Sequence, residues 1–279
     1  MTTPDHLSGD AGDVTNPWRR AKRTLGELAF EAADRATGVG RRADALARAT
    51  PARRVLVSGV YRPESLLALG SLGSERHEMR CALGATSAAD PALAEHTVAE
   101  GLSGGKFENL NRVLSGVAEF DWLLVVDDDV RLPARFLDRF LAVCERFELD
   151  LAQPAQSQRS HSAWRVTRRR PASLVRQTRF VEIGPLTAFG RRAAAELLPF
   201  PELRFGWGLD LHWAALAAER GWRLGVVDAT PVRHESATVG SAYRTEDARA
   251  EAASFLADRP HLPAERAGDV VATHRRTAR

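Results

Sequence analysis

Short apolar runs alternate with amphipathic segments along most of the chain. Two runs are nearly continuous in apolar residues and have the length of strands: 55–61 (VLVSGVY) and 121–126 (DWLLVV), and 77–85 (HEMRCALGA) could form another strand. Runs of this kind are typical of strands buried on both faces of a sheet. We expect further strands near 149–153, 164–168 and 179–183, and over the late segment WRLGVVDATPVRH.

Helical periodicity occupies the segments between these runs. Proline suits the first turn of a helix, so Pro63 and Pro133 mark helix starts. Other core helices are expected after Asp90, within GGKFENLNRVLSG, over 191–198 and after GWGLD. Ahead of the core, residues 18–50 predict a helical extension whose apolar residues share one stripe. These residues are Leu25, Leu28, Ala29, Ala32 and Ala33.

Strands that alternate with helices predict an α/β fold. We expect one Rossmann-like, mainly parallel sheet with flanking helices. The chain divides into a disordered N-terminus (1–17), the helical extension (18–50), a core domain (51–240) and a C-terminal helical or flexible tail (241–279). Ligands bind beyond the carboxyl ends of the strands in such sheets. The residues that directly follow the run at 121–126 are therefore candidates for chemistry.

Composition is that of a globular chain, with 44% hydrophobic and 27% charged residues. No apolar run reaches the roughly 20 residues that span a bilayer. The first residues are polar and lack the apolar stretch of a secretory signal. Cys81 and Cys144 are far apart, which fits two thiols in a reducing compartment. We therefore expect a cytoplasmic protein with at most peripheral membrane contact.

The net charge is +3, and acidic residues are interspersed with basic ones almost everywhere. This mixture is typical of a solvated surface. The densest basic stretch, 165–179, holds six arginines and no acid. Aromatic residues lie only at its ends, so it lacks the interleaved rings that stack on bases, and we expect no nucleic-acid partner. The stretch could face an anionic acceptor, such as one that carries phosphate.

Three adjacent carboxylates, Asp127, Asp128 and Asp129, directly follow the strongest strand. Such a cluster is electrostatically costly unless a cation compensates it. Oxygen ligands suit Mg²⁺ or Mn²⁺, and these ions bridge the phosphates of a nucleotide. In an extended backbone Asp127 and Asp129 point the same way and Asp128 points to the other side. A solvated acidic loop is the alternative.

Two later segments add candidate side chains. In GWGLD, Asp210 lies at the start of a predicted helix, where an acid can also serve only as a cap. The two glycines let a ligand approach the backbone, and Trp207 offers a flat face for a sugar. His234 ends the late strand, and imidazole suits a Mn²⁺ site. A lone histidine is also common as a hydrogen-bonded surface residue.

In chain order these segments resemble the glycosyltransferase A-type fold of the nucleotide-diphospho-sugar transferase superfamily. The resemblance runs from about residue 55 to residue 240, through the three aspartates, EIGPLTAFGRRAA, GWGLD and His234. A glycosyltransferase-like family of unknown function, common in plants and also present in bacteria, is more closely similar. Its resemblance covers LAQPAQSQRSHSAWRVTRRR, RFVEIGPLTAFGRRA, FGWGLDLHWAALA and LGVVDATPVRHES.

The resemblance implies a metal-dependent glycosyltransferase, with residues 51–240 as its catalytic domain. It would move a sugar from a nucleotide-diphospho-sugar to an unidentified hydroxyl acceptor. Asp127, Asp129 and His234 would hold Mn²⁺ or Mg²⁺. Asp210 would be the general base, which favours inversion at the sugar. The glutamate that often precedes this aspartate in the fold is replaced here by Leu209, and this departure weakens both assignments.

The resemblance also implies a donor site and an acceptor side. Lys106 is one of two lysines in the chain, and lysine is a common phosphate partner as well as a common surface residue. The donor or nucleotide would contact the end of the first strand, the GGKFENLN helix start and the acidic cluster. We assign to it Ser58, Gly59, Arg62, Lys106, Asn109, Asn111, Asp127 and Asp128, and we assign to the acceptor side Gly184, Trp207 and Gly208.

Other interpretations use the same residues. An apolar strand that ends in acids also resembles phospho-receiver domains and haloacid-dehalogenase-like phosphatases. In both, that strand begins the domain and a downstream lysine binds the phosphoryl group. Here the core already begins at Arg54, and no lysine follows Lys106. A non-catalytic nucleotide-sugar or glycan-binding module on a degenerate transferase fold stays open.

Overall fold

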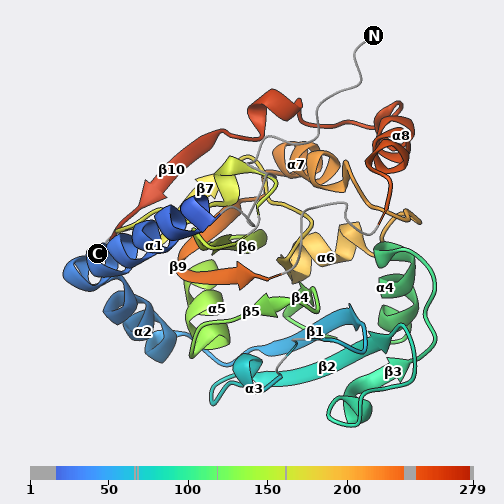
Figure 1. The fold of residues 1–279 in the computed structure, drawn as a ribbon, viewed down its shortest axis with the longest axis horizontal. Coiled ribbons are helices and arrows are strands. Elements are labelled where there is room, and N and C mark those ends of the chain that lie inside the picture. The colour runs from blue at the N-terminus through green and yellow to red at the C-terminus, as the bar shows by residue number, and fades with distance from the viewer. Residues whose placement is uncertain are drawn as a thin grey trace.

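The computed structural model describes residues 17–65, 67, 69–117, 119–160, 162–235 and 243–276. Within them a ten-stranded sheet follows the order β10-β7-β9-β6-β8-β4-β1-β2-β3, and β5 pairs with β9 (Figure 1). The strands are β1 (Arg54–Tyr61), β2 (Glu78–Ala85), β3 (Thr97–Ala99), β4 (Trp122–Val126), β5 (Val130–Arg131), β6 (Leu151–Gln156), β7 (Val175–Thr178), β8 (Leu186–Gly190), β9 (Leu224–His234) and β10 (Val270–His274).

Helices cover both faces of this sheet (Figure 1). They are α1 (Pro17–Thr37), α2 (Val39–Ala49), α3 (Leu69–Leu72), α4 (Lys106–Leu114), α5 (Phe136–Arg146), α6 (Arg191–Leu197), α7 (Leu209–Arg220) and α8 (Thr245–Leu256). Strand β4 is buried throughout and alternates between two cores. Leu123 and Val125 join the core of α4, α6 and α7, whereas Leu124 and Val126 join the core of α2 and α5.

Most strands run in one direction. The pairs β1–β2, β1–β4, β2–β3 and β6–β9 are parallel. Strands β7 and β8 pair antiparallel with all their neighbours, so they alone oppose the other strands on the path within the described residues. The predicted fold class, α/β with a single mainly parallel sheet and flanking helices, is confirmed.

Several predicted elements need correction. The segment 164–168 forms a 3₁₀ turn, and 179–183 follows β7 instead of forming a strand. The expected helix after Asp90 is a 3₁₀ turn followed by β3, because Thr97 and Ala99 pair in parallel with β2. After Pro63 the only helix before β2 in the described residues is the short α3. Strands β5, β7, β8 and β10 were not predicted.

The two ends of the chain contact the core differently. In the helical extension, Val39 and Ala43 of α2 are buried, and Asp44 pairs with Arg135 and Arg139 of the α5 segment. The tail expected to be helical or flexible holds α8 and also β10, which extends the sheet beyond β7. The predicted disorder of 1–17 falls outside the described residues except for Pro17. None of the described helices is long and apolar enough to cross a membrane.

Candidate functional site

Three predicted metal ligands come together beyond the carboxyl end of β4. The chain leaves β4 through the aspartates and at once forms β5, where Val130 pairs with His234 at the end of β9. This pairing places His234 beside the acidic cluster. Ligand atoms of Asp127, Asp129 and His234 all lie within 4.8 Å of one another. The imidazole Nε2 is 3.0 Å from Oδ1 of Asp129.

Asp128 points elsewhere and is held by Arg62, the residue that follows β1. The Arg62 guanidinium donates two hydrogen bonds to the Asp128 carboxylate, at 2.9 and 2.7 Å, and its backbone N–H donates a third at 2.9 Å. Planar two-point pairing of this kind fixes both side chains. The alternation along the chain therefore divides the cluster into one carboxylate bound to arginine and two that face His234.

Lys106 supplies a positive charge to the same place from the N-terminus of α4. Its Nζ lies 2.6 Å from Oδ1 of Asp127 and donates a hydrogen bond of 3.0 Å to the carbonyl of Ile183. Gly184 closes the contact: a Cβ at this position would lie 2.8 Å from Oδ2 of Asp127 and 3.2 Å from the lysine Nζ. Only glycine leaves room for the ion pair, so the glycine loop, α4 and β4 meet here.

The acids around the imidazole change its protonation. Burial lowers the pKa of His234, but its hydrogen bond to Asp129 and the charges of Asp129 and Asp127 outweigh this effect. Its pKa therefore lies above the ordinary value. A proton on the ring balances the carboxylates, and a divalent cation would compete with that proton for the same three side chains.

Two further carboxyl groups in this region, those of Asp210 and Glu182, have pKa values raised above the ordinary range. Asp210, in the first turn of α7, is only 6% exposed, and burial raises its pKa to about 7. Burial also raises the pKa of Glu182 to about 8, and the charges of Asp210 and Asp127 add to the shift. Both groups are poised to exchange protons near neutral pH.

Glu182 was missed by sequence reasoning. Its carboxylate accepts a hydrogen bond of 2.9 Å from the Gln156 side chain, and its backbone N–H donates to the Gln153 side chain, both from β6. The signal was available: Glu182 is the only acid between Asp150 and Glu196, and it lies two residues before the site glycine. An acid that stands alone in a long segment without other acids is a candidate for a specific role.

Other predicted donor residues are buried in the sheet or bind the backbone of the protein. Ser58 is buried within β1, and a Cβ on Gly59 would lie 2.4 Å from the carbonyl of Val126, so both belong to the sheet interior. The Asn109 side chain donates to the carbonyl of Gly104 at 2.8 Å. Asn111 exchanges two hydrogen bonds with the backbone of Phe200. The structure gives these four residues architectural contacts, and their contact with a donor stays a prediction.

On the acceptor side, Trp207 is buried instead of open. Its indole N–H donates to the Tyr243 hydroxyl at 3.0 Å, and the ring packs with Ala248 of α8. Gly208 has φ +88° and precedes α7, a left-handed conformation that favours glycine. Together these contacts set the entry of the helix that carries Asp210. The stacking of a sugar on Trp207 stays a prediction.

The basic stretch at 165–179 is only partly exposed. Arg176 is fully buried and pairs with the buried Asp228. Arg169 is 6% exposed and pairs with Glu27 and Asp34 of α1. The expectation that all six arginines could face an anionic acceptor is therefore wrong for these two, because acids distant in sequence neutralise them.

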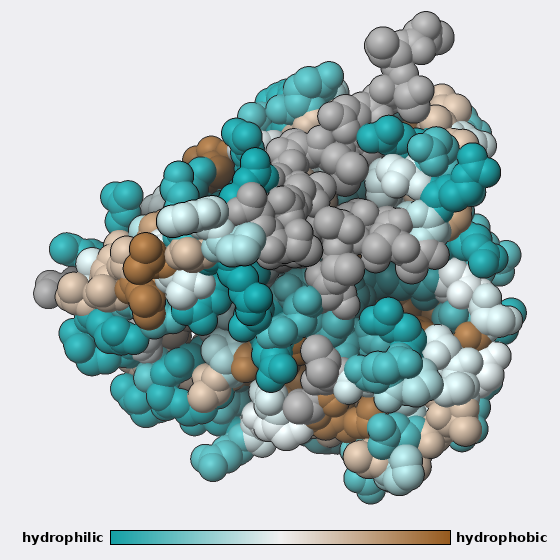
Figure 2. All heavy atoms as spheres, viewed as in Figure 1, coloured by the Kyte–Doolittle hydropathy of each residue, from teal (hydrophilic) through white to brown (hydrophobic). Residues whose placement is uncertain are grey.

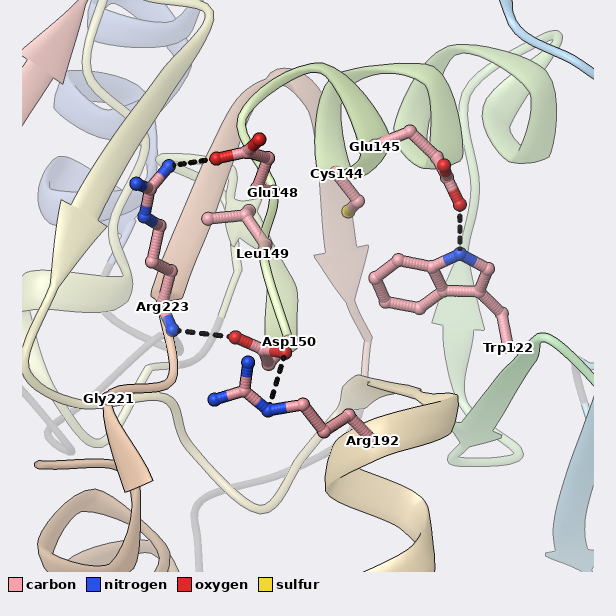
Figure 3. A pocket seen from close by; sticks show the side chains of 9 residues that line it. All are labelled: Trp122, Cys144, Glu145, Glu148, Leu149, Asp150, Arg192, Gly221 and Arg223. Carbon is pink, nitrogen blue, oxygen red and sulfur yellow. Dashed lines mark hydrogen bonds and ion pairs between the residues drawn. The ribbon is translucent and has the colours of Figure 1, made fainter. Parts of the chain in front are cut away.

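A cavity of about 460 Å³ lies at the opposite edge of the sheet, where β4, β6 and β9 begin (Figure 3). The Arg223 guanidinium pairs with Glu148 and the Arg192 guanidinium with Asp150. The backbone N–H of Arg223 also donates to Asp150, and the Trp122 indole N–H donates to Glu145. Ligands of such sheets bind at the carboxyl ends of the strands, so we do not place the donor in this cavity.

Comparison with known proteins finds similarity among solved structures. No family model and no curated protein matches the chain. The structure of GalNAc-T7 with UDP, GalNAc and Mn²⁺ is similar at 11% identity and a TM-score of 0.47. The match covers 65% of this chain and 43% of that one, so the chain spans less than half of GalNAc-T7.

A second similar structure is that of S. aureus TarS 1-349 in complex with UDP-GlcNAc. It is 15% identical with a TM-score of 0.48, and the match covers 77% of this chain and 69% of that one. Both are nucleotide-sugar glycosyltransferases of the A-type fold, the class that the sequence resembles. Such distant similarity says nothing about individual residues. The closer resemblance to the family found in plants and bacteria stays a prediction.

Proposed function

We propose that the chain is a metal-dependent glycosyltransferase that uses a nucleotide-diphospho-sugar. One observation carries this proposal: two carboxylates and an imidazole from separate strands converge within 4.8 Å beside a lysine, at the carboxyl edge of the sheet. That edge is where sheets of this type bind ligands. A mixed set of oxygen and nitrogen ligands next to a single cation suits a metal-bound diphosphate.

The residues present fit a divalent ion such as Mn²⁺ or Mg²⁺. Asp127, Asp129 and His234 would hold it, and the pairing of Val130 with His234 brings the imidazole to the two aspartates. When bound, the ion neutralises negative charge on the leaving diphosphate. Arg62 keeps Asp128 out of the ligand set and lies 3.9 Å from Asp129, so it also balances charge at the rim.

The chain's own groups divide the remaining tasks. Lys106 holds Asp127 in place and lies at the N-terminus of α4, where a helix favours phosphate. Asp210, with a pKa of about 7, accepts the proton of the acceptor hydroxyl as the oxygen attacks the sugar's anomeric carbon. Glu182, with a pKa of about 8, keeps its proton at neutral pH and so adds no second negative charge.

Ligand-induced stabilisation tests the donor site. UDP is a suitable first probe, with GDP, ADP and TDP for comparison, each with and without Mn²⁺. Stabilisation by a ligand at a hundred times its Kd amounts to about 2.7 kcal/mol, which a thermal-shift experiment detects easily. We expect one nucleoside diphosphate to raise the Tm only when Mn²⁺ is present, and Asp129→Ala to abolish the shift. Asp150→Asn, at the other edge, is the matched control and should keep it.

A turnover experiment then separates an enzyme from a binding module. The nucleotide identified by the shift is supplied as its sugar derivatives, and release of the diphosphate is followed over hours with and without candidate acceptors. Metal-dependent release that Asp210→Asn removes supports the transferase. Tight binding with no release or transfer would favour the non-catalytic module, and no binding of any nucleotide diphosphate would contradict both the transferase and a nucleotide-sugar-binding module.

A further inference from the structure

Helix α1 has its polar and apolar faces reversed relative to an ordinary surface helix. Its single buried residue in the described structure is an acid, Glu27. Three large apolar residues of the same helix face solvent: Trp18 is 86% exposed, Leu25 67% and Leu28 49%. The predicted apolar stripe therefore faces solvent at Leu25 and Leu28, whereas the apolar stripe of an ordinary surface helix faces the core.

Ionic contacts explain why the acidic face turns inward. Glu27 binds the guanidinium of Arg169 and accepts a hydrogen bond from the backbone N–H of Gln158. About two turns further on, Asp34 binds the same arginine and accepts a hydrogen bond from the backbone N–H of Ala172. These contacts attach α1 to the loop between β6 and β7. They fix the rotation of the helix and leave the apolar stripe outside.

Among the described residues of α1, the outward face combines apolar and cationic side chains with one partly exposed acid, Glu31, which pairs with Arg35. Glu31 and Asp34 are half-buried and Glu27 is buried. Figure 2 shows brown and tan residues gathered along α1, with teal residues beside them. The fully exposed residues of α1 are Pro17, Trp18, Arg19, Arg20, Ala21, Lys22, Leu25, Leu28, Ala29, Ala32, Arg35, Ala36 and Thr37.

Charge decides between the possible occupants of this face. A second copy of the helix would bring two sets of exposed cations together, and in the described helix the one partly exposed acid, Glu31, already pairs with Arg35. An anionic bilayer offers the opposite charge, and its interface accepts tryptophan and leucine. Juxtaposed basic residues add to such binding through the negative surface potential. We propose that α1 docks the protein on the surface of an anionic lipid membrane, with Trp18, Leu25 and Leu28 inserted among the headgroups.

This surface lies close to the candidate site in the fold. The loop that carries Gln158 and Arg169 also carries Ser160, whose hydroxyl accepts the backbone N–H of His234. Membrane docking and the convergent acids thus share one supporting loop. The docking inference nevertheless stands apart from the proposed sugar transfer, because vesicle binding requires neither a metal nor a donor.

Vesicle flotation with the full chain tests the inference. The probes are vesicles of phosphatidylcholine alone and vesicles with added phosphatidylserine. We expect binding at least tenfold tighter to the anionic vesicles, weakened by salt because the cations contribute. Leu25→Ser with Leu28→Ser should reduce binding at least tenfold, and Arg20→Gln with Lys22→Gln should remove the preference for anionic lipid. All four side chains are exposed, so circular dichroism and the Tm should not change.

Val98→Ser is the matched control, because Val98 is an apolar residue of β3 that is 59% exposed and lies away from α1. Its vesicle binding should equal that of the wild type. Failure of the wild type to float with either vesicle would overturn the proposal. So would a dimer in solution that Leu25→Ser with Leu28→Ser dissociates, since that result assigns the stripe to a second copy.

Discussion

The two edges of the sheet carry similar acids in opposite electrostatic states. At the amino edge, Glu145 accepts hydrogen bonds from Arg53 and from the Trp122 indole, and these contacts lower its pKa. Asp121 accepts from the backbone N–H of Arg54, which lowers its pKa too. Nearly every charge that lines the cavity there has an opposite charge or a donor beside it (Figure 3).

At the carboxyl edge the acids outnumber their partners. Burial raises the pKa of Asp210, and burial together with the charge of Asp210 raises the pKa of Glu182 more than the charge of Lys106 lowers it. Asp127 and Asp129 share Lys106 and His234. Acids that stabilise a fold are usually paired with a cation or a hydrogen-bond donor. Acids in functional sites often lack such compensation, so their pKa values are shifted at a cost in stability. The contrast thus supports the proposal that the site lies at the carboxyl edge and that the amino edge serves stability.

The largest expected effect follows from Asp210→Asn. Loss of a general base costs about 10² to 10⁴ in rate, so transfer should fall by that factor while nucleotide binding persists. The measurement is the initial rate of donor turnover, with the Kd of the nucleotide as the second readout. A variant that transfers sugar at the wild-type rate would remove Asp210 from the mechanism.

The same substitution should also stabilise the fold. The folded pKa of Asp210 is about 7 and its ordinary value is 3.8, so the carboxylate destabilises the folded state increasingly as pH rises from 3.8 to 7. Asn removes this cost, which is at most about 4 kcal/mol from a shift of this size. Denaturation at pH 8 should show the gain, and denaturation at pH 4 should show almost none.

Glu145→Gln, at the amino edge, should instead lower the free energy of unfolding at neutral pH. Loss of hydrogen bonds to a charged group costs about 1.5–3 kcal/mol per bond, and the partly exposed pair lies at the low end. The folded pKa of Glu145 is lowered, so its contribution is present above the ordinary value of 4.5 and disappears as pH falls through the folded value. Urea denaturation at pH 7 and pH 3 should show a difference between variant and wild type that shrinks in acid, with turnover unchanged.

Glu182→Gln should have a smaller effect that depends on pH. With a pKa of about 8 the side chain is mostly protonated at pH 7, so the neutral amide resembles it and turnover should stay within about threefold. At pH 9 the wild type gains a carboxylate beside Asp210 and the variant does not, so their pH profiles should separate. A hundredfold loss at pH 7 would instead make Glu182 the base.

Arg223→Ala should have the smallest effect. Its partner Glu148 is 72% exposed and Arg223 itself 51%, and exposed pairs contribute about 0–1 kcal/mol. We expect a Tm close to that of the wild type and unchanged nucleotide binding. A loss of nucleotide binding would place the donor at the amino edge and would contradict the assignment of the site to the carboxyl edge.

The sequence predicted the features that depend on local pattern. The apolar runs located β1, β2, β4 and β9, and alternation along an extended chain separated Asp128 from its two neighbours. The short strands β3, β7 and β10 were missed because they hold only three to five residues and are stabilised by pairing with distant strands. Periodicity within so few residues carries little information.

Contacts between residues distant in sequence could not be predicted from the local sequence pattern. The pairing of Asp228 with Arg176, and of Glu27 with Arg169, turned apparent surface charges into buried ones. The same contacts rotated α1 so that its apolar stripe faces outward. Glu182 became part of the site only because β6 and the glycine loop bring it near Asp210. Such outcomes depend on which strands become neighbours.

Direct titration of Mn²⁺ tests the central claim, that Asp127, Asp129 and His234 form a divalent metal site. Electron paramagnetic resonance follows the signal of free Mn²⁺ as protein is added. We expect the wild type to remove that signal more strongly with the bound nucleoside diphosphate, and Asp129→Ala and His234→Ala to leave it nearly intact. Equal Mn²⁺ binding by the wild type and both variants, or no binding by any of them, would contradict the account.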